Sequence, residues 1–173
     1  CVEKCHRNAI TIKDDLKYYN ALIDTKKCVD CGLCTKVCPR ENDNDMSKPK
    51  WWYQGWADSE IREHASSGGV ASAIIRAFIK HGGYVASCLF DSGKFVFEVT
   101  NEMAVARKFA GSKYVKSNPE KIYGKIQSLL KENQKVLFIG LPCQVAEVNQ
   151  FIKDKTNLVT ADLICHGTPS PYL

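Results

Sequence analysis

One stretch of the sequence decides the fold of its amino-terminal part: Cys28-Val29-Asp30-Cys31-Gly32-Leu33-Cys34-Thr35-Lys36-Val37-Cys38-Pro39. Its spacing is C-x2-C-x2-C-x3-C-P. Three thiolates spaced in this way bind one Fe4S4 cube, and the fourth cysteine turns away to a second cube. Zinc is the alternative, but structural zinc sites generally hold two ligand pairs far apart in sequence, and this stretch does not. The spacing therefore favours iron–sulfur chemistry over zinc.

A partial copy of the same pattern lies at the start of the chain. Cys1-Val2-Glu3-Lys4-Cys5-His6 repeats the end of the stretch as C-x3-C, with His6 where the second copy has Pro39. Two cysteines of this copy are missing, so we expect the chain to be a fragment of a longer protein. The alternative is that the two cysteines at the start are incidental and that only one cluster forms.

Together the two copies resemble the two-cluster, bacterial-type ferredoxin module. In that module the fourth cysteine of each copy binds the other cluster. The resemblance implies that one 4Fe-4S cluster is bound by Cys28, Cys31, Cys34 and Cys5. It implies that the second cluster is bound by Cys1 and Cys38, with two cysteines upstream of this chain. The full-length protein would then hold two clusters.

The overall composition excludes several classes of protein. The chain has 173 residues and nine cysteines, an odd number, and six of them fall within the first 38 residues, which is not the pattern of a disulfide scaffold. Lysine and arginine number 24 against 19 acidic residues, a net charge of +5 without a basic run, so nucleic acid is not predicted as a partner. No apolar stretch is long enough to be a transmembrane segment. We expect a cytoplasmic protein.

The pattern of turns and apolar residues predicts two domains. Residues 1–46 are predicted to form an α+β ferredoxin-like dicluster module with short strands at 9–13 and 19–23, joined by a turn at Asp14-Asp15. The polar stretch 40–50 is predicted to be a linker or surface loop. Residues 47–173 are predicted to form an α/β domain with a mixed sheet.

The α/β domain is predicted from its periodicity. Apolar residues at helical spacing from Val70 to Phe78 predict a helix, and Asn118-Pro119 is predicted to open another. Residues 84–90 and 95–99 are predicted to form a hairpin. Residues 135–165 are predicted to form a βαβ unit with two parallel strands, at 136–140 and 158–165, and a helix at about 143–153 between them.

Three segments of this domain carry residues suited to chemistry. Ser66-Ser67-Gly68-Gly69 precedes a helix, so its N–H groups could bind phosphate; the alternative is a helix capped by Ser67. Gly140-Leu141-Pro142-Cys143-Gln144 and Cys165-His166 each follow a predicted strand. Ligands bind outside the carboxyl ends of parallel strands, so Cys143 and His166 are predicted to share one edge of the sheet. Cys143 is predicted to be either a thiol with a lowered pKa at a helix start or a buried structural cysteine.

An aromatic group, Trp51-Trp52-Tyr53-Gln54-Gly55-Trp56, follows the predicted linker. It could pack the two domains together or stack on a flat cofactor. Packing is the interpretation that we favour, because the group lies next to the linker.

In order and spacing, these segments resemble the β-subunit family of coenzyme F-420 hydrogenases and dehydrogenases. The matching strings are the cysteine pattern, Ser66 to Gly69, Gly111-Ser112-Lys113-Tyr114-Val115-Lys116-Ser117, Gly140 to Gln144, and Asp162-Leu163-Ile164-Cys165-His166-Gly167-Thr168-Pro169-Ser170. The resemblance implies a flavoprotein that holds FAD and passes electrons between iron–sulfur clusters and coenzyme F-420 or another acceptor. It also implies a carboxyl-terminal domain that is missing here, and as partners a redox protein or hydrogenase or dehydrogenase subunits.

The same resemblance suggests roles for individual residues. Ser66, Ser67, Gly68, Gly69 and Lys113 would hold the FAD phosphates. Gly140, Pro142 and Gln144 would bind the cofactor, and Cys143 and His166 would be catalytic. Cys143 could instead bind iron. The alternative function is a ferredoxin-like electron-transfer adaptor without its own catalysis, such as a member associated with bacterial polysaccharide biosynthesis.

Overall fold

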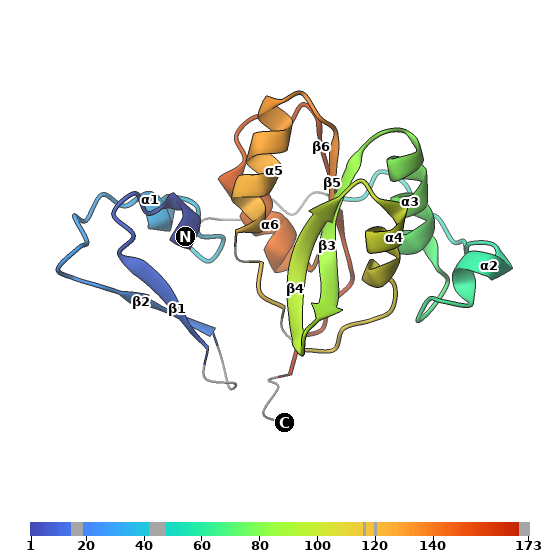
Figure 1. The fold of residues 1–173 in the computed structure, drawn as a ribbon, viewed down its shortest axis with the longest axis horizontal. Coiled ribbons are helices and arrows are strands. Elements are labelled where there is room, and N and C mark those ends of the chain that lie inside the picture. The colour runs from blue at the N-terminus through green and yellow to red at the C-terminus, as the bar shows by residue number, and fades with distance from the viewer. Residues whose placement is uncertain (15–18, 42–47, 116, 120, 170–173) are drawn as a thin grey trace.

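The computed structural model describes residues 1–14, 19–41, 48–115, 117–119 and 121–169 (Figure 1). The predicted boundary at residues 46 and 47 lies outside these ranges, as do Asp15 of the predicted turn, most of the predicted linker, Lys116 and Ser170.

The amino-terminal part contains four short elements. They are the 3₁₀ helix η1 (Val2–Lys4), strands β1 (Ile10–Asp14) and β2 (Tyr19–Ile23), and helix α1 (Leu33–Lys36). The two strands pair antiparallel, which confirms the predicted strands. Among the described residues of this part only Ala9 and Ile10 are buried apolar residues. A core of this size cannot hold a fold on its own, so other bonds must stabilise this part.

The α/β part is built on a four-stranded sheet in the order β4-β3-β5-β6. Strands β3 (Tyr84–Asp91) and β4 (Lys94–Thr100) form the predicted antiparallel hairpin. Strand β5 (Val136–Gly140) is parallel to β3 and to β6 (Leu158–Asp162). The sheet is therefore mixed, as predicted, and β5, helix α6 (Pro142–Phe151) and β6 form the predicted βαβ unit.

Helices cover both faces of the sheet (Figure 1). Helix α5 (Ile122–Lys131) and α6 pack on one face around Phe138 and Val136. Helices α3 (Val70–Lys80) and α4 (Met103–Ala106) and the 3₁₀ helix η2 (Arg107–Phe109) pack on the other face around Leu137 and Ile139. Alternate side chains of β5 thus belong to opposite cores. A short helix α2 (Ser59–Arg62) precedes α3.

Three predicted boundaries were wrong. The last strand ends at Asp162 instead of residue 165, because its partner β5 ends at Gly140 and the Leu163 N–H makes the final bond to the Gly140 carbonyl (2.9 Å). Helix α5 begins at Ile122, after Lys121 in the left-handed conformation (φ 65°), and not at Asn118-Pro119. The cap of α3 is left-handed Gly69, not Ser67.

No helix of the described ranges is both long enough and apolar enough to cross a membrane.

The Phe138→Ala variant tests the importance of the α5/α6 core. The Phe138 ring is fully buried and stacks on Phe97, with ring centroids 5.5 Å apart. Its removal leaves a cavity in the core, so we expect a loss of about 3–5 kcal/mol in the free energy of unfolding, measured by denaturant titration. Phe90→Ala on the exposed end of β3 is the matched control and should cost much less. Equal losses in the two variants would contradict this account.

Candidate functional site

The amino-terminal cysteines are available as ligands. All six are free thiols, and each is exposed or partly exposed. The Ala9 N–H donates to the Cys5 sulfur (3.3 Å), and this bond holds the pKa of Cys5 below its usual value. Gly32 adopts a left-handed conformation (φ 68°) at the start of α1, where the chain turns between two of the cysteines. Hydrogen bonds to sulfur and a tight glycine turn suit an iron–sulfur donor set.

The two copies of the cysteine pattern lie together, because η1 contacts α1 and β1. Within the described ranges, no three Cys, His, Asp or Glu side chains form a group that could hold a single metal ion. The donor set itself, thiolates in the spacing C-x2-C-x2-C-x3-C with a partial copy, fits iron–sulfur clusters. The assignment of each cysteine to a cluster stays a prediction.

Two side chains of η1 attach the cysteine-rich part to the α/β part. The Gly124 N–H in α5 donates to the Glu3 carboxylate (2.6 Å). The Lys4 ammonium lies 3.8 Å from the centroid of the Phe151 ring, at the end of α6. A Cβ atom on Gly124 would come within 2.8 Å of the Glu3 carboxylate, so this contact requires glycine or a shift of Glu3.

A groove with a volume of about 250 Å³ lies at this junction. Cys1 and Cys38 line it from the cysteine-rich part, and Tyr123, Glu147 and Phe151 line it from α5 and α6. The Tyr123 hydroxyl donates to the Glu147 carboxylate (2.5 Å), and burial, with Glu147 beside it, raises the pKa of Tyr123. The hydroxyl stays protonated at neutral pH.

The carboxyl edge of the parallel strands brings together part of the predicted site. Gly140 pairs with Asp162, so the segments that follow β5 and β6 leave the sheet side by side. The Cys165 thiol is close enough to Cys143 to contribute to its raised pKa. His166, the residue after Cys165, is exposed. The structure thus brings the two thiols near one another, and the predicted shared site of Cys143 and His166 stays a prediction.

The predicted lowering of the Cys143 pKa was wrong. Cys143 does lie at the start of α6, and backbone N–H groups there favour the thiolate. Partial desolvation of the sulfur and the Glu147 carboxylate one turn along outweigh them, and the pKa of Cys143 is raised. The residue as a whole is exposed, so the alternative of a buried structural cysteine was wrong as well. A thiol with a raised pKa is a weaker nucleophile at neutral pH.

The Gly140-to-Gln144 segment is held by its own hydrogen bonds. Buried Gln144 accepts from the Leu141 N–H (2.9 Å) and donates to the Ser117 hydroxyl (3.1 Å). A Cβ on Gly140 would lie 2.8 Å from the Phe138 ring and 3.1 Å from the Gln144 amide oxygen. Pro142 occupies the first turn of the helix, where it loses no hydrogen bond. These contacts alone account for Gly140, Pro142 and Gln144, and their role in cofactor binding stays a prediction.

The two predicted phosphate-binding segments meet in space. The Ser112 N–H donates to the Ser66 hydroxyl (2.7 Å), which joins the Ser66-to-Gly69 segment to the segment of Lys113. The Gly68 carbonyl accepts from the Ala57 N–H (2.7 Å), and a Cβ on Gly69 would lie 3.1 Å from that of Ala57. The glycines therefore serve close packing, which favours the alternative of a packed helix start. Ser67 is exposed.

Lys113 is enclosed by backbone oxygens. Its ammonium donates to the carbonyls of Lys108, Phe109, Ala110 and Gly111, at 2.7 to 3.4 Å. Burial lowers the pKa of Lys113, and the nearby Cys88 thiol acts in the opposite direction. The ammonium is thus already engaged, and a phosphate would have to compete with these carbonyls.

The predicted packing of the aromatic group is not found. Trp51, Trp52, Tyr53 and Trp56 have exposed fractions between 69% and 89%. Side chains this exposed do not pack the two parts together.

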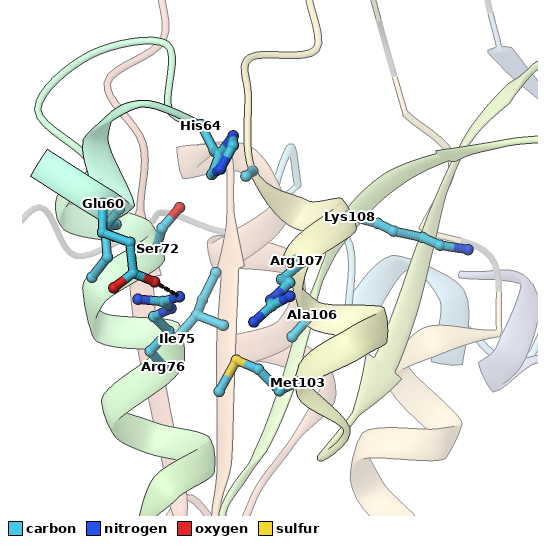
Figure 2. Close-up of a pocket in the computed structure, with 11 residues that line it drawn as sticks. Glu60, His64, Ser72, Ile75, Arg76, Met103, Ala106, Arg107 and Lys108 are labelled. Carbon is cyan, nitrogen blue, oxygen red and sulfur yellow. Dashed lines mark hydrogen bonds and ion pairs between the residues drawn. The ribbon is translucent and has the colours of Figure 1, made fainter.

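The sequence analysis missed a second hollow. A cavity of about 500 Å³ lies between α2, α3 and the α4–η2 segment, with Arg76, Arg107 and His64 among its lining residues (Figure 2). Arg76 donates to Glu60 at its rim (2.8 Å). The elements that build it come from two segments, α2–α3 and α4–η2, which are more than twenty residues apart in sequence, so no local pattern predicted it. The only sequence signal is the basic pair Arg107-Lys108 next to a short helix.

Comparisons with known proteins identify the amino-terminal part. Residues 1–42 match the family of 4Fe-4S dicluster domains. The match assigns 4Fe-4S cluster binding to this part of the chain, as the cysteine spacing predicted. It covers less than half of the chain.

Two further comparisons concern the longer chain. An uncharacterised protein of Methanocaldococcus jannaschii is 27% identical over an alignment of 141 residues, and the match covers 76% of this chain and 39% of that protein. The fold resembles a chain of the F-420-reducing nickel–iron hydrogenase complex from Methanosarcina barkeri, with a TM-score of 0.53 and 20% identity. That likeness covers 64% of this chain and 42% of the other, and at this identity it shows the fold alone.

The pH dependence of alkylation tests the Cys143 environment. Because its pKa is raised, the rate of reaction of Cys143 with iodoacetamide should still increase at pH values where a free cysteine has reached its maximum rate. Peptide mass spectrometry would follow this residue alone. Glu147→Gln removes the repelling carboxylate and should move the profile to lower pH, whereas Glu98→Gln should not. A wild-type profile at or below that of free cysteine would contradict the assignment.

The Lys113→Met variant tests whether Lys113 is structural. Its replacement leaves partly buried carbonyls without a donor, so we expect a loss of about 1–3 kcal/mol in the free energy of unfolding. Lys94→Met in the exposed hairpin is the control and should change little. Unchanged stability with weakened FAD binding would instead support the role in phosphate binding.

Proposed function

We propose that this chain belongs to an iron–sulfur flavoprotein oxidoreductase, in which electrons pass between 4Fe-4S clusters and FAD and on to coenzyme F-420 or another hydride or electron acceptor. The match of residues 1–42 to the dicluster domain supports the cluster half of this proposal. The likeness of the fold to a chain of an F-420-reducing hydrogenase complex supports the acceptor half.

One observation carries the proposal: cysteines of the cluster-binding part line a groove together with residues of the α/β part. Cys1 and Cys38, the proposed ligands of the second cluster, lie across this groove from Tyr123 and Phe151. Electron transfer between a cluster and a second redox group requires a short path through packed groups. Glu3 and Lys4 hold the two parts together at this point.

The residues on the α/β side lead from the groove toward the carboxyl edge of the sheet. Cys143 acts on the pKa of Tyr123, so the start of α6 lies near the groove lining. Glu147 contacts Tyr123 and raises the pKa of Cys143. When bound, a flavin would convert one-electron transfer by clusters into two-electron hydride chemistry. We propose that Cys143 and His166 lie at its reactive edge, where a protonated thiol at neutral pH could hold or supply a proton.

Exposed residues of the cluster-binding part offer a surface to a redox partner. Cys28 and Cys31 are exposed, with exposed Val29 between them, and Leu22 and Ile23 are exposed as well. Exposed apolar residues beside cluster ligands suit a short-lived complex with another electron-transfer protein. A hydrogenase or dehydrogenase subunit or a ferredoxin is the partner that we propose.

A second candidate function is an electron-transfer adaptor without its own catalysis. It is favoured by the hydrogen bonds of Lys113, Gln144 and Ser66, which already engage groups that the flavin would need. In an adaptor, the α/β part would only dock a partner.

Cofactor content distinguishes these two functions. The full-length protein should be purified without oxygen and analysed for iron, acid-labile sulfide and flavin. Two clusters correspond to about eight irons per chain, and the flavoprotein proposal expects in addition one FAD per chain. Two clusters without flavin would exclude the flavoprotein and favour the adaptor. A colourless protein that binds zinc would overturn both.

The Cys31→Ala variant tests the role of the cysteine pattern. In the full-length protein it should remove about four of eight irons and the electron paramagnetic resonance signal of one cluster. The far-ultraviolet circular dichroism of the α/β part should be retained, because its cores contain no cysteine of the cluster-binding pattern. Cys88→Ala, in β3, is the matched control and should keep both clusters. Unchanged iron in Cys31→Ala would contradict the ligand assignment.

A further inference from the structure

The cavity between α2, α3 and η2 differs from the cluster groove in its charge. Figure 2 shows side chains from three elements directed toward one space: Glu60 and His64 from α2 and the turn after it, Arg76 from α3, and Arg107 from η2. Lys108 also lines the cavity, but its ammonium points away.

The basic groups of this cavity act on a single carboxylate. Arg76 donates to Glu60 (2.8 Å) and contributes most to holding the pKa of Glu60 below its usual value. Arg107 and His64 lower this pKa further. Glu60 therefore lies in a positive field from opposite walls of the cavity. The two arginines and Glu60 give this space a net charge of about +1.

We propose that this cavity binds a phosphate-bearing small molecule, held between the guanidinium groups of Arg76 and Arg107. Arginine binds phosphate through two parallel N–H bonds, so two arginines facing one space suit a group with several oxygens and more than one charge. Glu60 has a side chain that is 76% exposed, so it can swing into solvent and release Arg76 to the ligand. The proposal does not depend on the clusters or on FAD.

The shape of the cavity agrees with a ligand larger than a phosphate ion. Its volume of about 500 Å³ lies within the range of small-molecule sites. Ile75 and Met103 provide an apolar wall beside the arginines, and the Ser72 hydroxyl provides a polar group at the α3 side. We therefore expect a phosphate group to bind at the arginines and an apolar or aromatic part, as in a nucleotide, to bind along this wall.

Titration calorimetry with ADP and with inorganic pyrophosphate tests the proposal. The anaerobically purified full-length protein would be used with both probes, at fixed ionic strength because charged contacts are screened by salt. Arg107→Gln should weaken binding of both probes about tenfold or more, because it removes a charged hydrogen-bond donor. Glu60→Gln should strengthen binding by about threefold or more, because it removes the competing carboxylate and frees Arg76.

The opposite signs of these two effects separate a binding site from a structural ion pair. Loss of a structural pair would weaken binding in both variants. Lys94→Gln, an exposed cation in the distant hairpin, is the control for general charge and should leave both affinities unchanged. Circular dichroism would verify that each variant is folded.

The outcomes decide the source of the phosphate as well. Tighter binding of ADP than of pyrophosphate supports a nucleotide as the ligand, and equal or tighter binding of pyrophosphate supports a free diphosphate. The proposal is overturned if neither probe binds at about 10 mM, if Glu60→Gln weakens binding, or if Lys94→Gln weakens it as much as Arg107→Gln.

Discussion

The complete burial of β5 is the constraint on which the rest of the α/β part depends. Every residue from Val136 to Gly140 is buried, so both faces of the sheet must be covered and both edges of the strand must be paired. The helices α5 and α6 satisfy the first requirement on one face, and α3 with the α4–η2 segment satisfies it on the other. The same packing places the cluster groove beside α5 and α6, and it places the basic cavity on the opposite side, at α3.

Local sequence patterns were sufficient for the strands and for the type of sheet. Alternation and turn residues predicted the β3–β4 hairpin, and the near-continuous apolar run predicted the buried strand β5. The ends of elements depended on contacts that a local pattern does not contain. The last strand ends where its partner β5 ends, with a final hydrogen bond from the Leu163 N–H to the Gly140 carbonyl. Helix α5 begins only after Lys121, which adopts the left-handed conformation. Side-chain capping by Ser67 was a reasonable expectation, but a glycine pressed against Ala57 took that position.

The candidate site was predictable where topology determines it and unpredictable where packing does. Parallel pairing of β5 and β6 alone predicts that the segments carrying Cys143 and His166 leave the sheet at one edge. The raised pKa of Cys143 depends on burial and on Glu147, and the engagement of Lys113 depends on how its loop closes around the ammonium. Arg76 and Arg107 are 31 residues apart in sequence, and only the folding of the α4–η2 segment against α3 brings them to the same cavity. The cysteine ligands could be predicted from sequence, because three ligands of one cluster lie at fixed short spacings along the chain.

The attachment through η1 has a thermodynamic consequence. Glu3 and Lys4, which contact Gly124 and Phe151, lie between Cys1 and Cys5 in the chain, the two cysteines that we propose as ligands of different clusters. Docking of η1 on the α/β part and binding of iron by these cysteines therefore restrict the same three-residue turn. The coupling is reciprocal. If docking of η1 stabilises cluster binding by some free energy, cluster binding stabilises the docking of η1 by the same amount. Oxidative loss of a cluster would then weaken the attachment of η1 to the α/β part.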